Sequence, residues 1–237
     1  MVTHAHAAST VQVGQAGRHA AWFLFGNVVA FAIPYLGVSR LGLQHDVFYA
    51  CYFATVLALL GGYARVEHIE LRAMFTRNWI WSAAIGAVIA LAIARNVLVN
   101  SDPTPRPHGG YFVFELLWRG VGYGAIDALL LTAFPCAVAY ALLQGRISGL
   151  LGRLRFIALA LPLIVVITAT YHLGYPQIRQ DGIGRPETGN TLISVPTLLT
   201  ANPIGSIGTH ITMHVTAVAH AYETRDYLPP QTFVSSK

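Results

Sequence analysis

A carboxylate and a guanidinium group lie within a long apolar stretch of this chain. Glu115 and Arg119 stand four residues apart in the segment 111–143, which otherwise consists mainly of apolar and small residues. On a helix, residues at i and i+4 share one face, so each charge can offset the other. Ionisable side chains at membrane depth are costly, which makes this pair a candidate functional site.

Histidines in two later apolar segments could face this pair. His172 ends one segment, and His210 and His214 stand four residues apart in another, where a helix would place both rings on one face. A second carboxylate, Asp127, lies about two turns beyond Arg119. We therefore predict that three segments contribute to one buried polar site made of Glu115, Arg119, His172, His210 and His214.

Two chemistries suit this set of residues. In the first, a carboxylate and His172 hold and deprotonate a water molecule, while His210 and His214 stabilise a developing oxyanion. In the second, the three histidines and Glu115 bind a divalent metal such as zinc or iron. The first chemistry needs no cofactor. The glutamate of the HExxH motif is missing after His210, so the zincin pattern does not apply.

The elements that position these residues must be membrane helices. Of the 237 residues, 54% are hydrophobic and 11% are charged, whereas a soluble domain carries roughly 25% charged residues. The apolar residues form continuous runs of helix-spanning length, not the short alternating segments of a membrane β-barrel. We predict an all-α polytopic transmembrane helical bundle with about six to eight segments, in a cell membrane such as the bacterial inner membrane.

Turn-forming residues divide the chain into its expected spans. These cover residues 21–38, 48–63, 79–94, 111–143, 156–172 and 204–222, with 191–199 as a short re-entrant segment. The segment 111–143 would be about 50 Å long as a helix, which exceeds a hydrocarbon core of about 30 Å. We therefore expect it to bend or to form two pieces, with breaks among Gly120, Gly122, Gly124 and Pro135.

The distribution of charge divides the chain further and suggests an orientation. We expect a polar N-terminal tail (1–20), a transmembrane scaffold (21–110), a transmembrane core (111–222) and a C-terminal tail (223–237). The arginine-rich connections 65–77 and 146–155 should both be cytoplasmic, which requires that 111–143 crosses the membrane once. Because the basic residues are scattered in short connections, they do not indicate nucleic-acid binding.

The order of the polar motifs resembles the CPBP family, which comprises the CAAX-protease and bacteriocin-processing (Abi) intramembrane proteases. That family has Glu-Glu-x-x-x-Arg, Phe-x-x-x-His and His-x-x-x-Asn/Asp on successive helices. In residues 109–222 the same order is found in Glu115-x-x-x-Arg119, His172 and His210-x-x-x-His214. Three family positions differ and are occupied here by Phe114, Thr168 and His214.

The resemblance implies an intramembrane peptide-bond hydrolase, or a relative without activity, that acts on a membrane-associated peptide or protein. Glu115 would activate water, oriented by Arg119 and partnered by His172, and the residues implied as oxyanion donors are His210 and His214. One alternative is a non-enzymatic membrane protein that binds a metal, haem or a partner subunit. Another is a transporter that relays protons through Asp127 and Glu115.

Overall fold

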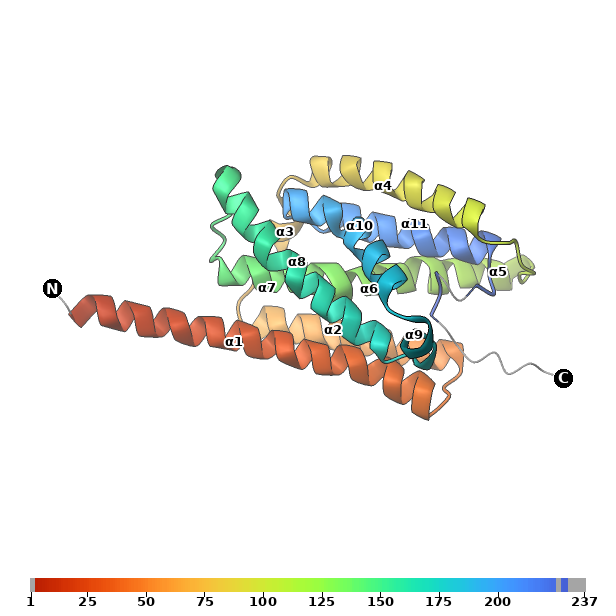
Figure 1. Ribbon diagram of the computed structural model, residues 1–237, viewed down its shortest axis with the longest axis horizontal. Helices are drawn as coiled ribbons and strands as arrows, with labels where there is room; N and C mark the ends of the chain where they lie inside the picture. Colours follow the sequence, from red (N-terminus) through yellow and green to blue (C-terminus); the bar gives the residue numbers. More distant parts are fainter. Residues whose placement is uncertain (1–2, 225–226, 230–237) are drawn as a thin grey trace.

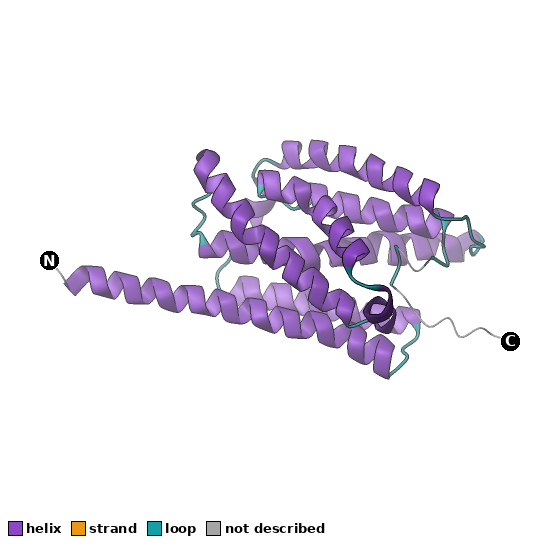
Figure 2. Cartoon of the chain, viewed as in Figure 1, coloured by secondary structure: helices purple, strands orange, loops and turns teal. Residues whose placement is uncertain are grey.

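Helices make up every regular element of this computed structural model, which describes residues 3–224 and 227–229, with side chains from Gly14 onward. The long helices lie side by side and are joined by short loops at the two ends of the bundle (Figures 1 and 2). The first helix, α1, begins at Thr3, so the expected polar tail (1–20) is helical from that residue onward.

Within the described residues, five helical segments are long and apolar enough to cross a membrane, namely Gly14–Arg40, His45–Val66, Trp79–Asn100, Gly109–Leu142 and Gly149–Leu173. The first lies in α1 (Thr3–Pro34) and the π-helical turn η1 (Tyr35–Arg40). The second, third and fifth are α2, α4 and α8. The prediction of an all-α membrane bundle is therefore confirmed, whereas the expected number of six to eight segments is not.

Two further helices, α10 (Gly184–Thr200) and α11 (Ile204–His220), run through the bundle. Each has 17 residues and is therefore about 25 Å long, slightly less than the hydrocarbon thickness. The short re-entrant segment expected at 191–199 is instead the second half of α10, which continues through Pro196. The polar stretch between α8 and α10 is also helical in part, because it contains α9 (Pro176–Asp181).

The segment 111–143, which carries Glu115, Arg119 and Asp127, forms one continuous helix rather than two pieces. It comprises α5 (Gly109–Glu115), η2 (Leu116–Gly122), α6 (Tyr123–Ala128), η3 (Leu129–Ala133) and α7 (Phe134–Leu142), of which η2 and η3 are π-helical. π-Helical turns are rare, and they are found frequently at functional sites. One continuous helix is compatible with the single crossing that the charge distribution required.

The glycines of this helix serve close packing instead of breaking it. A Cβ atom at Gly124 would lie 2.8 Å from the Cα of Ile211, and one at Gly120 would lie 3.2 Å from the Cα of Val215. Both contacts are with the backbone of α11, so only glycine allows the two helices to approach this closely. The expectation of a break at Gly120 or Gly124 is therefore wrong.

The loops gather at two ends of the bundle. At one end, which we call the basic end, Asn78 donates to the Thr200 carbonyl (3.2 Å), and Arg77 and Arg153 line one small cavity. At the opposite end, Ser39 donates to the Gly174 carbonyl (2.8 Å). The two arginine-rich connections, 65–77 and 146–155, thus lie at the same end, where α3 (Leu71–Thr76) is also found.

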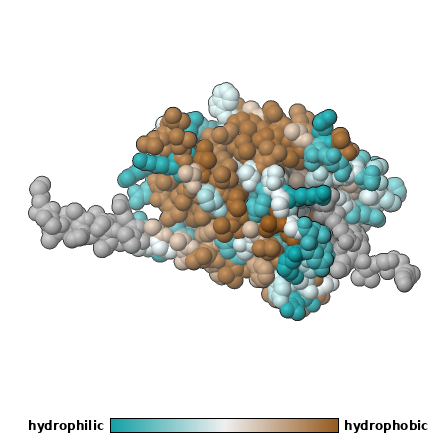
Figure 3. Space-filling model, viewed as in Figure 1, coloured by the Kyte–Doolittle hydropathy of each residue, from teal (hydrophilic) through white to brown (hydrophobic). Residues whose placement is uncertain are grey.

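The outer surface between the two ends is apolar. Space-filling representation shows hydrophobic residues over most of the visible flank of the bundle, with polar residues gathered toward its ends (Figure 3). Large apolar side chains are highly exposed there, among them Leu91 (73%), Val88 (69%) and Leu24 (66%). Such a surface suits contact with lipid and would be unusual for a soluble monomer.

Candidate functional site

Asp127 is the centre of the most polar part of the interior. It lies in α6, between the two π-helical turns, and only 4% of its surface is exposed. Its Oδ1 accepts a hydrogen bond from the Tyr52 hydroxyl on α2 (2.9 Å). Its Oδ2 lies 3.5 Å from His210 Nδ1 and 3.7 Å from His214 Nε2. A buried carboxylate surrounded in this way by titratable rings is a functional-site candidate.

The two histidines come from one face of α11. They are buried, with exposures of 1% for His210 and 3% for His214, and their ring centroids are 6.2 Å apart. One ligand atom from each ring and one from Asp127 all lie within 4.8 Å of one another. The close approach at Gly124, whose Cβ would also lie 3.0 Å from the His210 carbonyl oxygen, brings α11 near enough for this contact.

Asn190 on α10 connects His210 to α8. Its Oδ1 lies 2.9 Å from His210 Nε2, and its Nδ2 donates to the Thr168 hydroxyl (2.6 Å). Asn190 is 4% exposed and Thr168 is fully buried, so solvent does not compete for these bonds. Asn190 falls between the spans expected from the sequence (156–172 and 191–199), and nothing in its neighbourhood marked it as a site residue.

The Asn190 amide fixes the protonation pattern of His210. With the amide placed as described, Oδ1 is an acceptor, so His210 Nε2 must carry a hydrogen. The other ring nitrogen, Nδ1, then has a lone pair in the neutral ring, and it faces the Asp127 carboxylate at 3.5 Å. Two acceptors that face each other in a buried site repel. A proton or another cation between the two groups would remove this repulsion.

His172 provides a further nitrogen for this part of the interior. Its Nδ1 donates to the Thr168 carbonyl (2.8 Å), the usual i to i−4 geometry on a helix, because the carbonyl can only accept. The remaining nitrogen, Nε2, therefore carries a lone pair and can act as a base or a ligand. His172 lies within electrostatic range of Asp127, His210 and His214.

Tyrosines form the wall on the other side of Asp127. The hydroxyl groups of Tyr123 and Tyr171 are 2.7 Å apart, and those of Tyr171 and Tyr175 are 2.8 Å apart. The Tyr123 ring also packs edge-on against His214, with 4.8 Å between ring centroids. Large aromatic rings exclude bulk water from the carboxylate while their hydroxyl groups satisfy one another.

Glu115 and Arg119 form a separate cluster further along the same helix. Arg119 Nη1 lies 3.8 Å from Glu115 Oε2, which also accepts a hydrogen bond from the Tyr222 hydroxyl (3.0 Å). The Tyr222 ring lies against the guanidinium group, 4.6 Å from its carbon. Both charged residues are buried, as predicted, at 3% and 2% exposure. Among the described residues, none of the hydrogen bonds or ion pairs of Glu115 involves a histidine.

The structure thus groups the predicted residues differently from the expected site. His210 and His214 contact Asp127, a residue that the sequence placed at membrane depth but outside the site, and His172 is bonded to the Thr168 carbonyl within electrostatic range of the same carboxylate. Phe114, at the position of the first glutamate in the CPBP pattern, is 43% exposed. His220, which ends α11, is bonded to the Ser101 carbonyl (3.1 Å) and lies apart from the other histidines.

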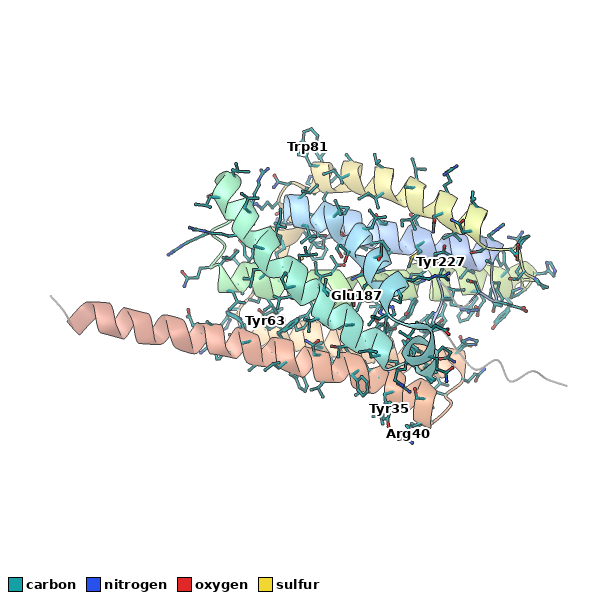
Figure 4. All side chains as sticks on the ribbon, viewed as in Figure 1. Tyr35, Arg40, Tyr63, Trp81, Glu187 and Tyr227 are labelled. Atoms are coloured by element: carbon teal, nitrogen blue, oxygen red, sulfur yellow. The ribbon has the colours of Figure 1, made fainter. Side chains whose placement is uncertain are left out.

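Glu187 is an acidic side chain near the start of α10, the helix that carries Asn190. Glu187 is in the first turn of α10, three residues before Asn190, near the opposite end of the bundle (Figure 4). Both of its carboxylate oxygens are enclosed and accept no hydrogen bond from the described residues. This burial raises the pKa of Glu187 to about 7. The group is therefore ready to change charge near neutral pH.

The arrangement can do either of two kinds of chemistry. A buried carboxylate with a shared proton can remove a proton from water, and histidine N–H groups can stabilise an oxyanion. One carboxylate and two imidazoles can also bind a divalent metal. Comparison of the chain with protein-family models, curated proteins and solved structures finds no match.

Proposed function

We propose that this protein is an intramembrane hydrolase, acting on peptide bonds in or near a cell membrane such as the bacterial inner membrane. The observation that carries this proposal is the contact of Asp127 Oδ2 with His210 and His214, at 3.5 and 3.7 Å, inside an apolar bundle. The resemblance to the CPBP proteases supports the same reaction class, with Asp127 in the role that the sequence assigned to Glu115.

In the proposed reaction, Asp127 and His172 hold a water molecule against the carbonyl carbon of the substrate. Asp127 accepts a proton as the water oxygen attacks, and the carbonyl oxygen becomes an oxyanion. The N–H group of the His214 ring stabilises that oxyanion, which a neutral imidazole can do through its one N–H. The N–H group of His210 remains bonded to Asn190, so His210 positions the carboxylate. The proton then passes to the leaving amine as the C–N bond breaks, so the carboxylate is regenerated.

The test is hydrolysis of an internally quenched peptide that carries one apolar helix, measured with purified protein in liposomes. Asp127→Asn and His172→Ala should each lower the rate by about 100-fold or more, the usual contribution of a general base. Glu115→Gln is the matched control, because it removes a buried carboxylate from the same helix. We expect it to retain activity if the protein remains folded. Full activity in Asp127→Asn would overturn the proposal.

The same contacts favour a second function, a membrane protein that binds a divalent metal. A tetrahedral zinc ion with bonds of about 2.1 Å holds its ligand atoms roughly 3.4 Å apart, close to the 3.5 and 3.7 Å observed. His210 Nδ1 and both ring nitrogens of His214 are buried and have no hydrogen-bond partner among the described residues. A cation there would remove the repulsion between His210 Nδ1 and the carboxylate.

Metal analysis separates the two functions. Stoichiometric zinc in the purified protein, lost in Asp127→Asn and in His214→Ala, would establish the metal site. Hydrolysis that persists after chelation, with no metal bound, would favour the metal-free mechanism. A visible absorption spectrum of the same sample tests for haem.

A further inference from the structure

A groove at the opposite end of the bundle presents two arginines and no acid. It has a volume of about 400 Å³ and lies where η1 and α9 meet, and it is lined by Phe31, Tyr35, Ser39, Arg40, Pro176 and Arg179. Figure 4 labels Tyr35 and Arg40 at this end, where η1 finishes. We call it the Arg40–Arg179 groove. It is separate from the site around Asp127, none of whose residues line it.

The two guanidinium groups share one aromatic ring. The guanidinium carbon of Arg40 lies 5.1 Å from the centroid of the Tyr35 ring, and that of Arg179 lies 5.9 Å from the same centroid. Arg40 Nε donates to the Tyr35 hydroxyl (2.8 Å), and Arg179 Nη1 donates to the Leu173 carbonyl (2.6 Å). These contacts hold both side chains in place, so the two arginines lose less conformational freedom when they bind a ligand.

Charge balance points to an anion in this groove. Neither Arg40 nor Arg179 takes part in an ion pair within the described part of the chain. Each guanidinium has five N–H donors. Arg40 uses Nε and Nη2 for the Tyr35 hydroxyl, and Arg179 uses Nη1 for the Leu173 and Gly174 carbonyls, so both keep donors for a ligand. Two positive groups held near one ring repel each other, and a phosphate between them would remove that repulsion through charge-assisted hydrogen bonds.

The apolar border of the groove indicates what is attached to the phosphate. The Phe31 and Tyr35 rings stack with 5.2 Å between centroids. Two leucines nearby are strongly exposed, Leu36 in η1 at 52% and Leu41, which directly follows η1, at 69%. The groove also lies at the end of the membrane span Gly14–Arg40, which is the depth of lipid headgroups. Acyl chains could therefore lie along this helix while the headgroup enters the groove.

We propose that the Arg40–Arg179 groove binds the phosphate of an anionic phospholipid. Such a lipid would join three elements, because Ser39 and Arg179 already bond to the Gly174 carbonyl at the end of α8. Through α8 it would stabilise the turn that follows His172. This proposal does not depend on the hydrolase function.

The test measures lipid retention by native mass spectrometry of the full-length protein in detergent. Phosphatidylglycerol and phosphatidylcholine are offered in equal amounts to the wild type and to the double variant Arg40→Gln/Arg179→Gln. We expect the wild type to retain phosphatidylglycerol preferentially, and the double variant to lose at least ten-fold of that preference. The control Arg65→Gln/Arg95→Gln removes the same charge from exposed sites outside the groove and should behave as the wild type does.

Two further measurements keep the result unambiguous. If the double variant does not fold, Arg40→Lys/Arg179→Lys keeps the charge and removes the fork geometry, so its preference should fall below that of the wild type. Inorganic phosphate at millimolar concentration is the second probe. Stabilisation of lipid-free protein by phosphate alone, with no preference between the two lipids, would overturn the lipid proposal and indicate a free-phosphate site. If the Arg65→Gln/Arg95→Gln control lost the lipid preference equally, the preference would depend on net charge alone, and the proposal would also be overturned.

Discussion

Asp127 and Glu115 are both buried acids on one helix, yet their surroundings give them different chemistry. Glu115 has a permanent cation, Arg119, at 3.8 Å and a tyrosine donor, so its charge is balanced. Asp127 has no arginine or lysine partner among the described residues, and its neighbours are histidines, which gain or lose protons under mild conditions. This difference makes Asp127 the better candidate for proton exchange with neighbouring side chains and Glu115 the better structural anchor.

A pH-dependent stability is expected from Glu187. Burial raises its pKa from 4.5 to about 7, so the folded protein holds this proton more tightly than the unfolded chain does. Its contribution to stability is therefore fully present below about pH 4.5 and is lost as the pH rises through about 7. Thermal unfolding in detergent should show that Glu187→Gln matches the wild type at pH 4.5 and melts at a higher temperature at pH 8.

The exposed acid Glu70 supplies the control for this experiment. Glu70→Gln should leave the pH dependence of the melting temperature as it is in the wild type. A Glu187→Gln variant whose melting temperature follows the wild type at both pH values would show that the burial of this carboxylate has no thermodynamic consequence.

At the level of elements, the site depends on how closely the long helix and α11 approach each other. Gly120 and Gly124 provide two backbone contacts on one face, four residues apart. The π-helical turns η2 and η3 lie on either side of α6 and set the direction in which Asp127 points. Small residues at such crossings allow close contact between helices in a membrane, where lipid offers no hydrophobic driving force for association.

Gly124→Ala should therefore alter the geometry of the site without replacing any of its polar side chains. The added methyl group would lie 2.8 Å from the Cα of Ile211, so α11 must shift away and carry His210 with it. We expect a loss of about 1–3 kcal/mol in stability, the usual cost of overpacking, together with reduced hydrolysis. Thermal unfolding and the peptide assay would measure both effects.

Gly208→Ala is the matched control on α11, since a Cβ there meets nothing within 4 Å. It should be neutral or slightly stabilising, because alanine is the better helix former. If Gly124→Ala behaved in the same way, close approach at this crossing would not be what positions His210.

For the whole molecule, the distribution of arginines sets the orientation in the membrane. The connections at the basic end carry six arginines, namely Arg65, Arg72, Arg77, Arg146, Arg153 and Arg155, against four at the opposite end, namely Arg40, Arg106, Arg179 and Arg185. Positively charged loops remain in the cytoplasm, so the basic end should be cytoplasmic. His172 and Asn190 both lie toward the other end, since α8 finishes there and α10 begins there. The site should then open away from the cytoplasm.

Cysteine labelling tests this orientation in intact cells. In a background of Cys51→Ser and Cys136→Ala, single cysteines replace Arg72 at the basic end or Gln180 at the opposite end. Both positions are exposed. A membrane-impermeant maleimide should label the Gln180→Cys protein in intact cells and the Arg72→Cys protein only after permeabilisation. The reverse pattern would invert the orientation, and labelling of both in intact cells would contradict the arrangement of the two ends.

The sequence by itself determined the helical membrane bundle and indicated the histidines of the candidate site, His172, His210 and His214. Long apolar runs and scarce charge are sufficient for this, because a helix is the only simple way to satisfy the backbone in lipid. The i to i+4 spacing likewise predicted that His210 and His214 share a face, and the charge pattern predicted one crossing for 111–143. These features depend on local composition and spacing alone.

Only the tertiary structure decided which carboxylate meets the histidines. Predicting a shared face from sequence requires a constant 3.6 residues per turn, and the π-helical turn η2 changes that period between Glu115 and Asp127. The role of Asn190 could not be predicted from the sequence either, because it follows from the packing of α10 between α8 and α11. The approach of two helices at Gly124 is a property of the pair, and neither sequence segment shows it alone.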